Sequence, residues 1–439
     1  MKLKIGYLFI VMIAFLIKAF PQDRLISKEE VLQMLLQNNR ELKIGREEVQ
    51  LANAAYRQTD AVLLPKVNLS YSGIVTNNPL VAFGSKLNQE AITASDFSPQ
   101  AFNDPDRIES FATIIDLEQP IFNLDGIYNR RAAKLKMEMA GLQQSRREDY
   151  FLLQAEKAYM ELQLAQQAVK ITKQAYQTAN AHFEVAQNLA QEGIIKKVDL
   201  LEAEINLSEA ESKMLKSATN FQNASDYLAF LLNIEMQVQL IPSDSLKKVS
   251  LDRLLDSSSF NLSESRADIK ALELAKKAGE LNLKAKRSSI FPRLNAFGSY
   301  QLYDNEVFQA DANGYFVGAR LSWNLFDGNQ RSAKTQSSRA EYEISKMRYL
   351  NHKSKSEMEM NQVMRSLEET ELQLKTAKLM MLQAEESLKI KSNRFEEGME
   401  KPADLKTAES LYTQKQLNYF QTIYEYNLAI ATLKFLNQE

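Results

Sequence analysis

Two stretches of this chain are almost free of the residues that interrupt helices. Residues 329–397 contain neither glycine nor proline, and residues 127–192 contain Gly141 alone. A helix through either stretch would be roughly 100 Å long at 1.5 Å per residue. An isolated helix of that length is not stable in water by propensity alone, so each must pack along its length.

The apolar residues of the first stretch follow the helical period. They recur every three or four positions among Gln, Lys and Glu, and the small residues among them suit close helix–helix approach. The residues of this stripe are Leu152, Ala155, Ala158, Tyr159, Leu162, Ala165, Val169, Ile171 and Ala175. The sequence therefore predicts long amphipathic coiled coils, which need no cofactor.

The two stretches end in closely similar sequences. EGIIKKVDLLEAE occupies residues 192–204, and EGMEKPADLKTAE occupies residues 397–409. In each copy the glycine, Gly193 or Gly398, is predicted to take the left-handed conformation just beyond a helix. The same helix-ending sequence therefore occurs twice, once in each half of the chain.

The residues after each glycine carry signals for the start of another helix. Asp199 and Asp404 can accept backbone N–H groups there, and Asp199 with Glu202 fits a capping box. Pro402 is compatible with a position in the first helical turn. The second helices are expected over about residues 198–233 and 403–435, which makes each copy a helical hairpin.

The duplication extends beyond the turns. LLPKVNLSYSG, which begins at Leu63, resembles IFPRLNAFGSY, which begins at Ile290, and PIFNLDG at Pro120 resembles SWNLFDG at Ser322. Each half is predicted to read helix, strand, loop, strand, very long helix, turn and helix. The predicted repeats cover residues 22–234 and 265–439, and a linker segment covers residues 235–264.

The predicted strands alternate polar and apolar side chains. In VNLSYSG, for example, Val67, Leu69 and Tyr71 oppose Asn68 and Ser70. Four such strands of about 9–11 residues have the length needed to cross a bilayer at a tilt. Alternation alone also fits a half-buried soluble sheet. In a membrane, four strands are too few to close a barrel, so several copies would have to share one.

The N-terminus carries an apolar run over residues 5–17 behind two lysines. This pattern predicts a secretory signal peptide over residues 1–21, because the run is short for the alternative, a membrane-spanning anchor. The mature protein is therefore expected to be exported. The absence of cysteine excludes disulfides and thiolate metal sites, and a net charge of −2 gives no field that would attract nucleic acid.

Catalytic chemistry finds little support in the sequence. The two histidines, His182 and His352, lie alone on predicted helices and are expected at the surface. There is no phosphate-binding glycine loop and no zinc motif. The carboxylates are spread over amphipathic helices, and they are expected to lie on the solvent-exposed faces of those helices. We therefore predict that the protein is not an enzyme and has no catalytic, metal-binding or cofactor-binding residues.

The order of these features resembles the TolC family of outer-membrane factors. The family pattern runs through RFEEGMEKPADLKTAE at residues 394–409, with its arginine, its glycine and the later Asp-Leu, Ala and Glu. Phe395 stands where the family usually has tyrosine, and Lys196 and Lys401 stand where it often has Ser or Thr. The duplicated architecture extends the likeness over nearly the whole mature chain.

The resemblance implies a mainly α-helical fold with membrane β-structure. Duplicated long helical hairpins from three copies would form a trimeric α-barrel, continuous with a shared 12-stranded outer-membrane β-barrel. Residues 235–264 would lie in an equatorial belt, and loops over about residues 76–107 and 304–313 would face outside. The protein would lie in the bacterial outer membrane and extend into the periplasm.

The implied function is the outer-membrane channel of a tripartite efflux pump or type I secretion system, a passive exit duct for small molecules or proteins. The implied partners are a homotrimer, a periplasmic adaptor protein, an inner-membrane RND or ABC transporter reached through the adaptor, and outer-membrane lipid. The turns would form periplasmic tips that contact the adaptor. The residues expected there are Gly193, Lys196, Asp199, Leu200, Gly398, Lys401, Asp404 and Leu405, and the candidate gate residues are Arg394, Glu397 and Glu400.

The alternative is an exported periplasmic coiled-coil adaptor or structural protein without a barrel. An adaptor should carry a single helical hairpin between Gly/Val-rich β-domains. This chain instead has two predicted hairpins, each after two alternating strands. The duplicated pattern therefore favours the channel.

Overall fold

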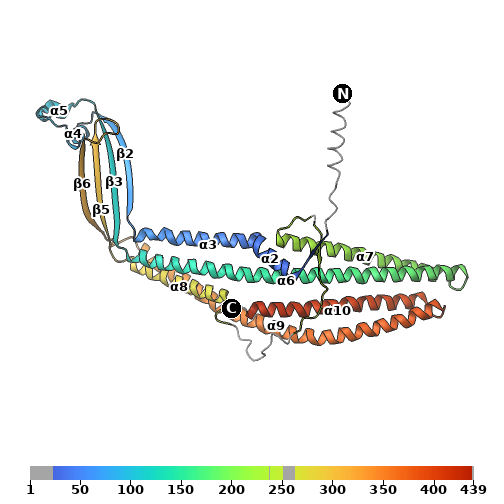
Figure 1. Ribbon diagram of the computed structural model, residues 1–439. Coiled ribbons are helices and arrows are strands. Elements are labelled where there is room, and N and C mark those ends of the chain that lie inside the picture. The colour runs from blue at the N-terminus through green and yellow to red at the C-terminus, as the bar shows by residue number, and fades with distance from the viewer. Residues whose placement is uncertain (1–22, 237, 251–262, 438–439) are drawn as a thin grey trace, which may run out of the picture. The chain divides into compact units, whose positions relative to one another are not determined.

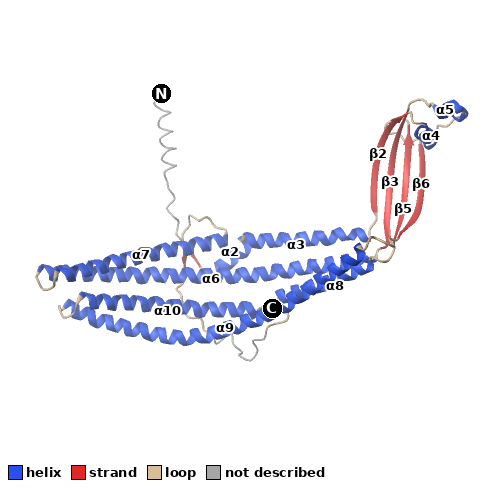
Figure 2. Cartoon of the chain, turned by 180° about the vertical axis from the view of Figure 1, so that it is seen from behind, coloured by secondary structure: helices blue, strands red, loops and turns tan. Residues whose placement is uncertain are grey.

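The computed structural model describes residues 23–236, 238–250 and 263–437, so the predicted signal peptide lies outside the described residues. Most of this part of the chain is helical (Figure 1, Figure 2). None of its helices combines the length and the hydropathy of a membrane-spanning segment. The helices are α2 (Lys28–Asn38), α3 (Arg40–Gln58), α4 (Pro79–Asn88), α5 (Pro99–Asn103), α6 (Leu124–Gln191), α7 (Lys197–Leu232), α8 (Ala267–Ser288), α9 (Gln330–Glu396) and α10 (Pro402–Asn437). The strands are β1 (Arg24–Ile26), β2 (Lys66–Thr76), β3 (Ile108–Phe122), β4 (Leu240–Pro242), β5 (Arg293–Asp304) and β6 (Ala312–Ser322).

The two glycine- and proline-poor stretches form the two long helices that the sequence predicts. α6 has 68 residues and α9 has 67, and both begin and end within a few residues of the expected limits. The predicted loop after β2 is wrong in part, because it contains α4 and α5. Asn78 Oδ1 accepts from Val81 N–H at 3.3 Å, and Ser98 Oγ accepts from Ala101 N–H at 3.2 Å. Here the Asn and Ser residues cap helices instead of marking a loop.

The described chain divides into two compact units. One contains the chain up to Glu47, Leu142–Ile269 and Asn351–Glu439, and the other contains Glu48–Gly141 and Lys270–Leu350. The first unit therefore holds both helical turns together with β1 and β4. The second unit holds the four long strands together with α4 and α5.

The four long strands form one antiparallel sheet in the order β2-β3-β5-β6 (Figure 1). Gly73 pairs with Phe111, and Gly318 pairs with Phe297. A Cβ atom at Gly73 would lie 2.7 Å from the Phe111 ring, and one at Gly318 would lie 2.8 Å from the Phe297 ring. Each phenylalanine ring thus covers the backbone of the glycine opposite it. A shift in strand register would place a residue with a side chain opposite the ring, and that side chain would collide with it.

A second, small sheet joins the start of the first predicted repeat to the predicted linker segment. β1 and β4 pair in parallel, with Ile26 opposite Pro242. No local sequence pattern predicts either strand, because each has only three residues and no room for an alternating pattern. The pairing joins the start of the described chain to the segment after α7.

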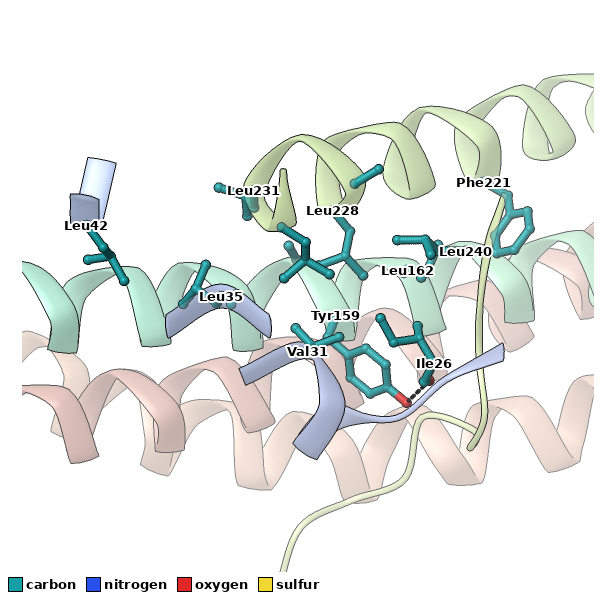
Figure 3. Packing of buried hydrophobic residues seen from close by; sticks show 14 residues of the cluster. Ile26, Val31, Leu35, Leu42, Tyr159, Leu162, Phe221, Leu228, Leu231 and Leu240 are labelled. Atoms are coloured by element: carbon teal, nitrogen blue, oxygen red, sulfur yellow. Dashed lines mark hydrogen bonds between the residues drawn. The ribbon is translucent and has the colours of Figure 1, made fainter. Parts of the chain in front are cut away.

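The largest apolar cluster of the first unit lies beside this small sheet. Figure 3 shows Tyr159 of α6 among buried side chains from α2, α7, β1 and β4. Its hydroxyl donates to Ile26 O at 3.3 Å and also contacts Asp244. Burial, together with the hydrogen bond to Asp244, raises the pKa of Tyr159 well above its ordinary value. Part of the predicted stripe is confirmed here, since Ala155, Ala158 and Leu162 are at most 1% exposed.

A buried charge cluster lies where α8 begins. Arg266, which is 1% exposed, donates to both carboxylate oxygens of Asp268 at 2.7 and 2.8 Å and to Leu436 O at 3.2 Å. His352 Nε2 lies 2.8 Å from Asp268, so its expected surface position is only partly correct. Burial acts to raise the pKa of Asp268, but hydrogen bonds from His352 and Arg266 outweigh it and hold that pKa well below its usual range.

The apolar cluster predicts which leucines of α7 stabilise the fold. Leu228 is fully buried, whereas Leu215 of the same helix is 58% exposed. We expect Leu228→Ala to reduce the free energy of unfolding by about 2–5 kcal/mol, because it removes packed methyl groups and leaves a cavity. Leu215→Ala is the matched control and should change it by less than about 0.5 kcal/mol. Circular dichroism during chemical unfolding of the detergent-solubilised protein measures both, and equal losses would contradict the packing described.

Candidate functional site

The first turn closes the hairpin of α6 and α7. Gly193 has a φ of +75°. Its N–H donates to Ala190 O at 3.2 Å, and the Ile194 N–H donates to Leu189 O at 2.9 Å. This pair of bonds is the Schellman pattern, in which a left-handed residue satisfies the last carbonyls of a helix. The predicted role of Gly193 as the residue just beyond the helix is confirmed.

The second turn repeats this geometry between α9 and α10. Gly398 has a φ of +70°, its N–H donates to Phe395 O at 2.9 Å, and the Met399 N–H donates to Arg394 O at 2.8 Å. An added Cβ atom at Gly398 would lie 3.9 Å from Ile194 of the first turn. The two turns are therefore neighbours, and the duplicated sequence produces two adjoining tips.

The start of α7 differs from the prediction. The N-cap residue is Lys196, and the helix begins at Lys197. Asp199 lies inside the first turn, where its carboxylate accepts the Lys196 N–H at 3.0 Å. The predicted capping box between Asp199 and Glu202 is therefore wrong by one turn. A carboxylate inside the first turn also suits the positive end of the helix dipole.

The start of α10 agrees with the prediction at its proline. Pro402 is the first helical residue, a position where the missing N–H costs nothing. Lys401 O accepts the N–H groups of Asp404 and Leu405, both at 3.1 Å. Lys401 therefore occupies the position in the second copy that Lys196 occupies in the first.

A small apolar cluster packs directly behind the tips. Phe395 is 1% exposed, Leu405 is 3% exposed, and Ala186 is fully buried in the same cluster. Leu200 is half-buried against the same cluster. Since α6, α7, α9 and α10 all contribute, the two hairpins are joined here. Leu200 and Leu405 thus face the helices and do not form a freely exposed tip surface.

Other apolar residues lie on the exposed surface of the tips. Ile194 is 58% exposed, Val198 55%, Leu201 47% and Met399 62%. These residues are not among the predicted tip residues. The sequence pattern that could identify them is that they are apolar, lie within two turns of a tip glycine and lie outside the apolar stripe that packs between helices.

The three candidate gate residues lie on the second tip. Arg394 Nε donates to Glu400 Oε2 at 2.9 Å, and Arg394 Nη2 contacts Met399 O at 3.4 Å. The Arg394 side chain is 56% exposed, and Glu397 is also exposed. The ion pair closes the turn to which both residues belong, so in this single chain it does not join the two hairpins.

A buried polar cluster joins the two hairpins about three helical turns from Gly193. His182 of α6 contacts Glu409 of α10 through Nδ1, and its Nε2 lies 3.0 Å from Ser392 Oγ of α9. Asn206 of α7 donates to the other Glu409 oxygen at 2.5 Å. The side chains of His182 and Glu409 are only 11% and 10% exposed. The expected surface position of His182 is therefore wrong, because its partner comes from the other half of the chain.

Glu409 also lines a small cavity between α6, α7 and α10. The cavity has a volume of about 30 Å³, which is enough for a water molecule with polar partners. Asn206, Thr172 and Lys213 supply polar groups around it. Among the described residues, no group of three or more His, Asp or Glu side chains is arranged to hold a metal ion. The cluster is thus a hydrogen-bonded link between helices.

Several known proteins are similar to this chain, among them the following three. Outer membrane protein OprJ of Pseudomonas aeruginosa is 23% identical over 394 residues, which cover 87% of this chain and 77% of OprJ. Cation efflux system protein CusC of Escherichia coli O157:H7 is 27% identical over 295 residues, which cover 66% of this chain and 57% of CusC. The crystal structure of the CmeC outer membrane channel of Campylobacter jejuni matches with a TM-score of 0.79 at 16% identity, over 93% of this chain and 85% of CmeC. The chain therefore shares the fold of that channel.

A protein-family model covers both halves of the chain. The model, described as outer membrane efflux protein, matches residues 31–233 and 261–437. These segments contain both tips and all four strands of the large sheet, and they amount to well over half of the chain. The predicted resemblance to outer-membrane efflux channels is thereby confirmed. The chain belongs to the outer membrane efflux protein family.

Proposed function

We propose that three copies of this chain form one outer-membrane channel, with four strands from each copy in a shared 12-stranded β-barrel. The observation that carries this proposal is the sheet, whose edge strands β2 and β6 each have one neighbour within the described residues. Each edge strand has 11 residues. An open edge of that length in lipid would leave its N–H and C=O groups unpaired. Pairing β6 of one copy with β2 of the next removes both edges.

The exposed side chains of β2 support a lipid-facing side. Val67 is 62% exposed and Leu69 is 71% exposed, while Asn68 and Ser70 alternate with them. Such a strand has no apolar cover within one copy. In a barrel, its apolar side chains would face lipid and its polar ones would face a water-filled lumen. The same alternation is ill suited to a soluble coiled-coil adaptor.

The exposed tip surface supports binding of a periplasmic adaptor. Ile194, Val198, Leu201 and Met399 supply apolar contact area, and Lys196, Lys401 and Asp404 supply an exposed polar rim. An apolar centre within a polar rim is the usual composition of a protein–protein contact. The channel would then be a passive exit duct for small molecules or proteins. An inner-membrane RND or ABC transporter, reached through the adaptor, would drive export.

We also propose that the contact between His182 and Glu409 holds the hairpins of one copy together in a closed channel. It is supported by burial, because a carboxylate that loses its partners in a buried place carries a large desolvation cost. It also spans all four helices near the tips. Arg394, Glu397 and Glu400 lie further out and are candidates for gating contacts between neighbouring copies.

The channel proposal predicts where the protein is found in the cell. We expect the intact protein in the outer-membrane fraction, as an oligomer of three chains that dissociates on heating. Fractionation followed by native and heated electrophoresis measures both properties. A soluble periplasmic monomer would contradict the proposal and would favour the coiled-coil alternative.

The tip assignment predicts the effect of a backbone change at Gly398. Gly398→Val places a β-branched residue at a φ of +70°, which costs of the order of 1–3 kcal/mol and distorts the turn. We expect export to fall severalfold while the oligomer and its membrane location are retained. Gly398→Asn is the matched control, because asparagine tolerates the left-handed region, and it should keep most of the export. Unchanged export by the valine variant would show that the turn is not a functional tip.

The proposed link predicts an opening of the channel when it is cut. We expect Glu409→Ala and His182→Ala each to raise single-channel conductance in planar bilayers, because either change removes the contact between α6 and α10. The double variant should add little to either single variant, since both act on one interaction. Glu386→Gln, at an exposed carboxylate of α9, is the control and should leave conductance unchanged. Closed channels in both alanine variants would refute the link.

A further inference from the structure

A group of cations without acidic partners lies where the second pair of strands meets its helices. We name this group the basic rim: Lys286, Arg287, Arg331, Lys334 and Arg339. Within the described residues, no carboxylate oxygen lies within 4.0 Å of a charged nitrogen of these side chains. All five belong to the second compact unit.

Several other lysines on the same two helices are paired with carboxylates of the same helix. On α8, Lys277 lies 2.8 Å from Glu273, and Lys284 lies 2.8 Å from Glu280. On α9, Lys346 lies 3.7 Å from Glu343. Cations without a carboxylate partner in the described part of the chain also occur farther along, such as Lys276 of α8 and Lys375 of α9. The basic rim differs because its five cations gather at the end next to the sheet.

Helix electrostatics explains only part of the basic rim. Lys286 and Arg287 lie in the last turn of α8, where cations suit the negative end of the helix dipole. Arg331 and Lys334 lie in the first turns of α9, where cations are disfavoured, and that first turn has no acidic residue. Asp327 sits just before α9, and its carboxylate accepts the backbone N–H of Arg331 at 3.0 Å. The Arg331 guanidinium also donates to Asn324 O. Neither Arg331 nor Lys334 has a carboxylate partner among the described residues, so an anion from outside this chain would stabilise these cations.

The basic rim borders a groove with apolar walls. Four of its members, Lys286, Arg287, Arg331 and Arg339, line a groove of about 720 Å³, and Asp327 is the single carboxylate among the lining residues. Ile290, Leu325 and Phe326 complete the apolar part of the lining.

The apolar walls of the groove are widely exposed. Phe326 is 85% exposed and Leu325 is 73% exposed. Trp323, which is 58% exposed, donates from Nε1 to Ile290 O at 2.9 Å and is thereby held beside the groove. Basic side chains next to exposed aromatic and aliphatic ones are typical of a membrane–water interface.

We propose that this groove binds the headgroup of an anionic phospholipid. The guanidinium groups of Arg287 and Arg339 would hold the phosphate, as arginine does well in paired hydrogen bonds. Leu325 and Phe326 would lie against the upper acyl chains. The proposal rests on the proposed channel, which puts this end of the sheet at a membrane interface. A carboxylate from a neighbouring copy is the competing occupant.

The test compares two lipids on the full-length protein in detergent. Dioleoyl phosphatidylglycerol and dioleoyl phosphatidylcholine have the same acyl chains, and native mass spectrometry counts the lipids that each oligomer retains. We expect the wild-type protein to retain phosphatidylglycerol preferentially. Arg287→Gln with Arg339→Gln should weaken that retention by roughly fivefold for each cation removed. The control, Lys277→Gln with Lys284→Gln, removes the same charge from α8 and should keep the preference.

Each other outcome has a distinct meaning. The lipid site would be overturned by equal retention of both lipids by the wild-type protein, or by an unchanged preference in the Arg287 and Arg339 variant. A trimer in the same spectra would still support the channel proposal. Dissociation of the oligomer in that variant would also overturn the lipid site, because the cations would then pair with a neighbouring copy. A wild-type protein that is monomeric throughout would contradict the channel proposal itself.

Discussion

The long helices can exist only where other parts of the chain cover their apolar sides. α6 alone has 68 residues, and a helix of that length is not held in water by its own hydrogen bonds. Tyr159 and Leu162 are covered by the cluster around Leu228, whereas near the tip the cover comes from Phe395 and Leu405 of the other hairpin. The tips are thus not independent loops, because their position depends on packing between the two halves.

Buried polar groups fix how the covered helices align. As whole residues, Glu409 and Arg266 are 8% and 1% exposed, and burial of such charges is costly unless every charged atom has a partner. Glu409 receives contacts from His182 and Asn206, and Arg266 contacts Asp268, Ser356 and a carbonyl near the end of α10. Apolar contacts tolerate sliding of one helix along another, whereas these hydrogen bonds do not. Apolar packing therefore stabilises the helices, and the polar clusters fix the alignment of one helix along another.

Local signals made much of the fold predictable. The lack of glycine and proline revealed α6 and α9, side-chain alternation revealed the strands, and Gly193 and Gly398 marked the turns. The missed features depend on contacts that are distant in sequence. His182 and Glu409 are 227 residues apart, and β1 pairs with β4 through only three residues each. No local pattern distinguishes a leucine that packs behind a tip, such as Leu405, from one that lies on its surface.

The duplicated halves share a backbone plan but differ in how they balance charge beside the sheet. In the first half, Arg130 pairs with Asp60 at 2.7 Å, and its guanidinium lies 4.8 Å from the centre of the Tyr56 ring. That cation already has its partners within the chain, so it has little to offer an external anion. In the second half, Arg331 and Arg339 lack such a carboxylate among the described residues. The two halves thus differ at these positions, since Arg130 has its partners within the chain while Arg331 and Arg339 have no carboxylate partner in its described part, and this difference favours the second half for the proposed lipid site.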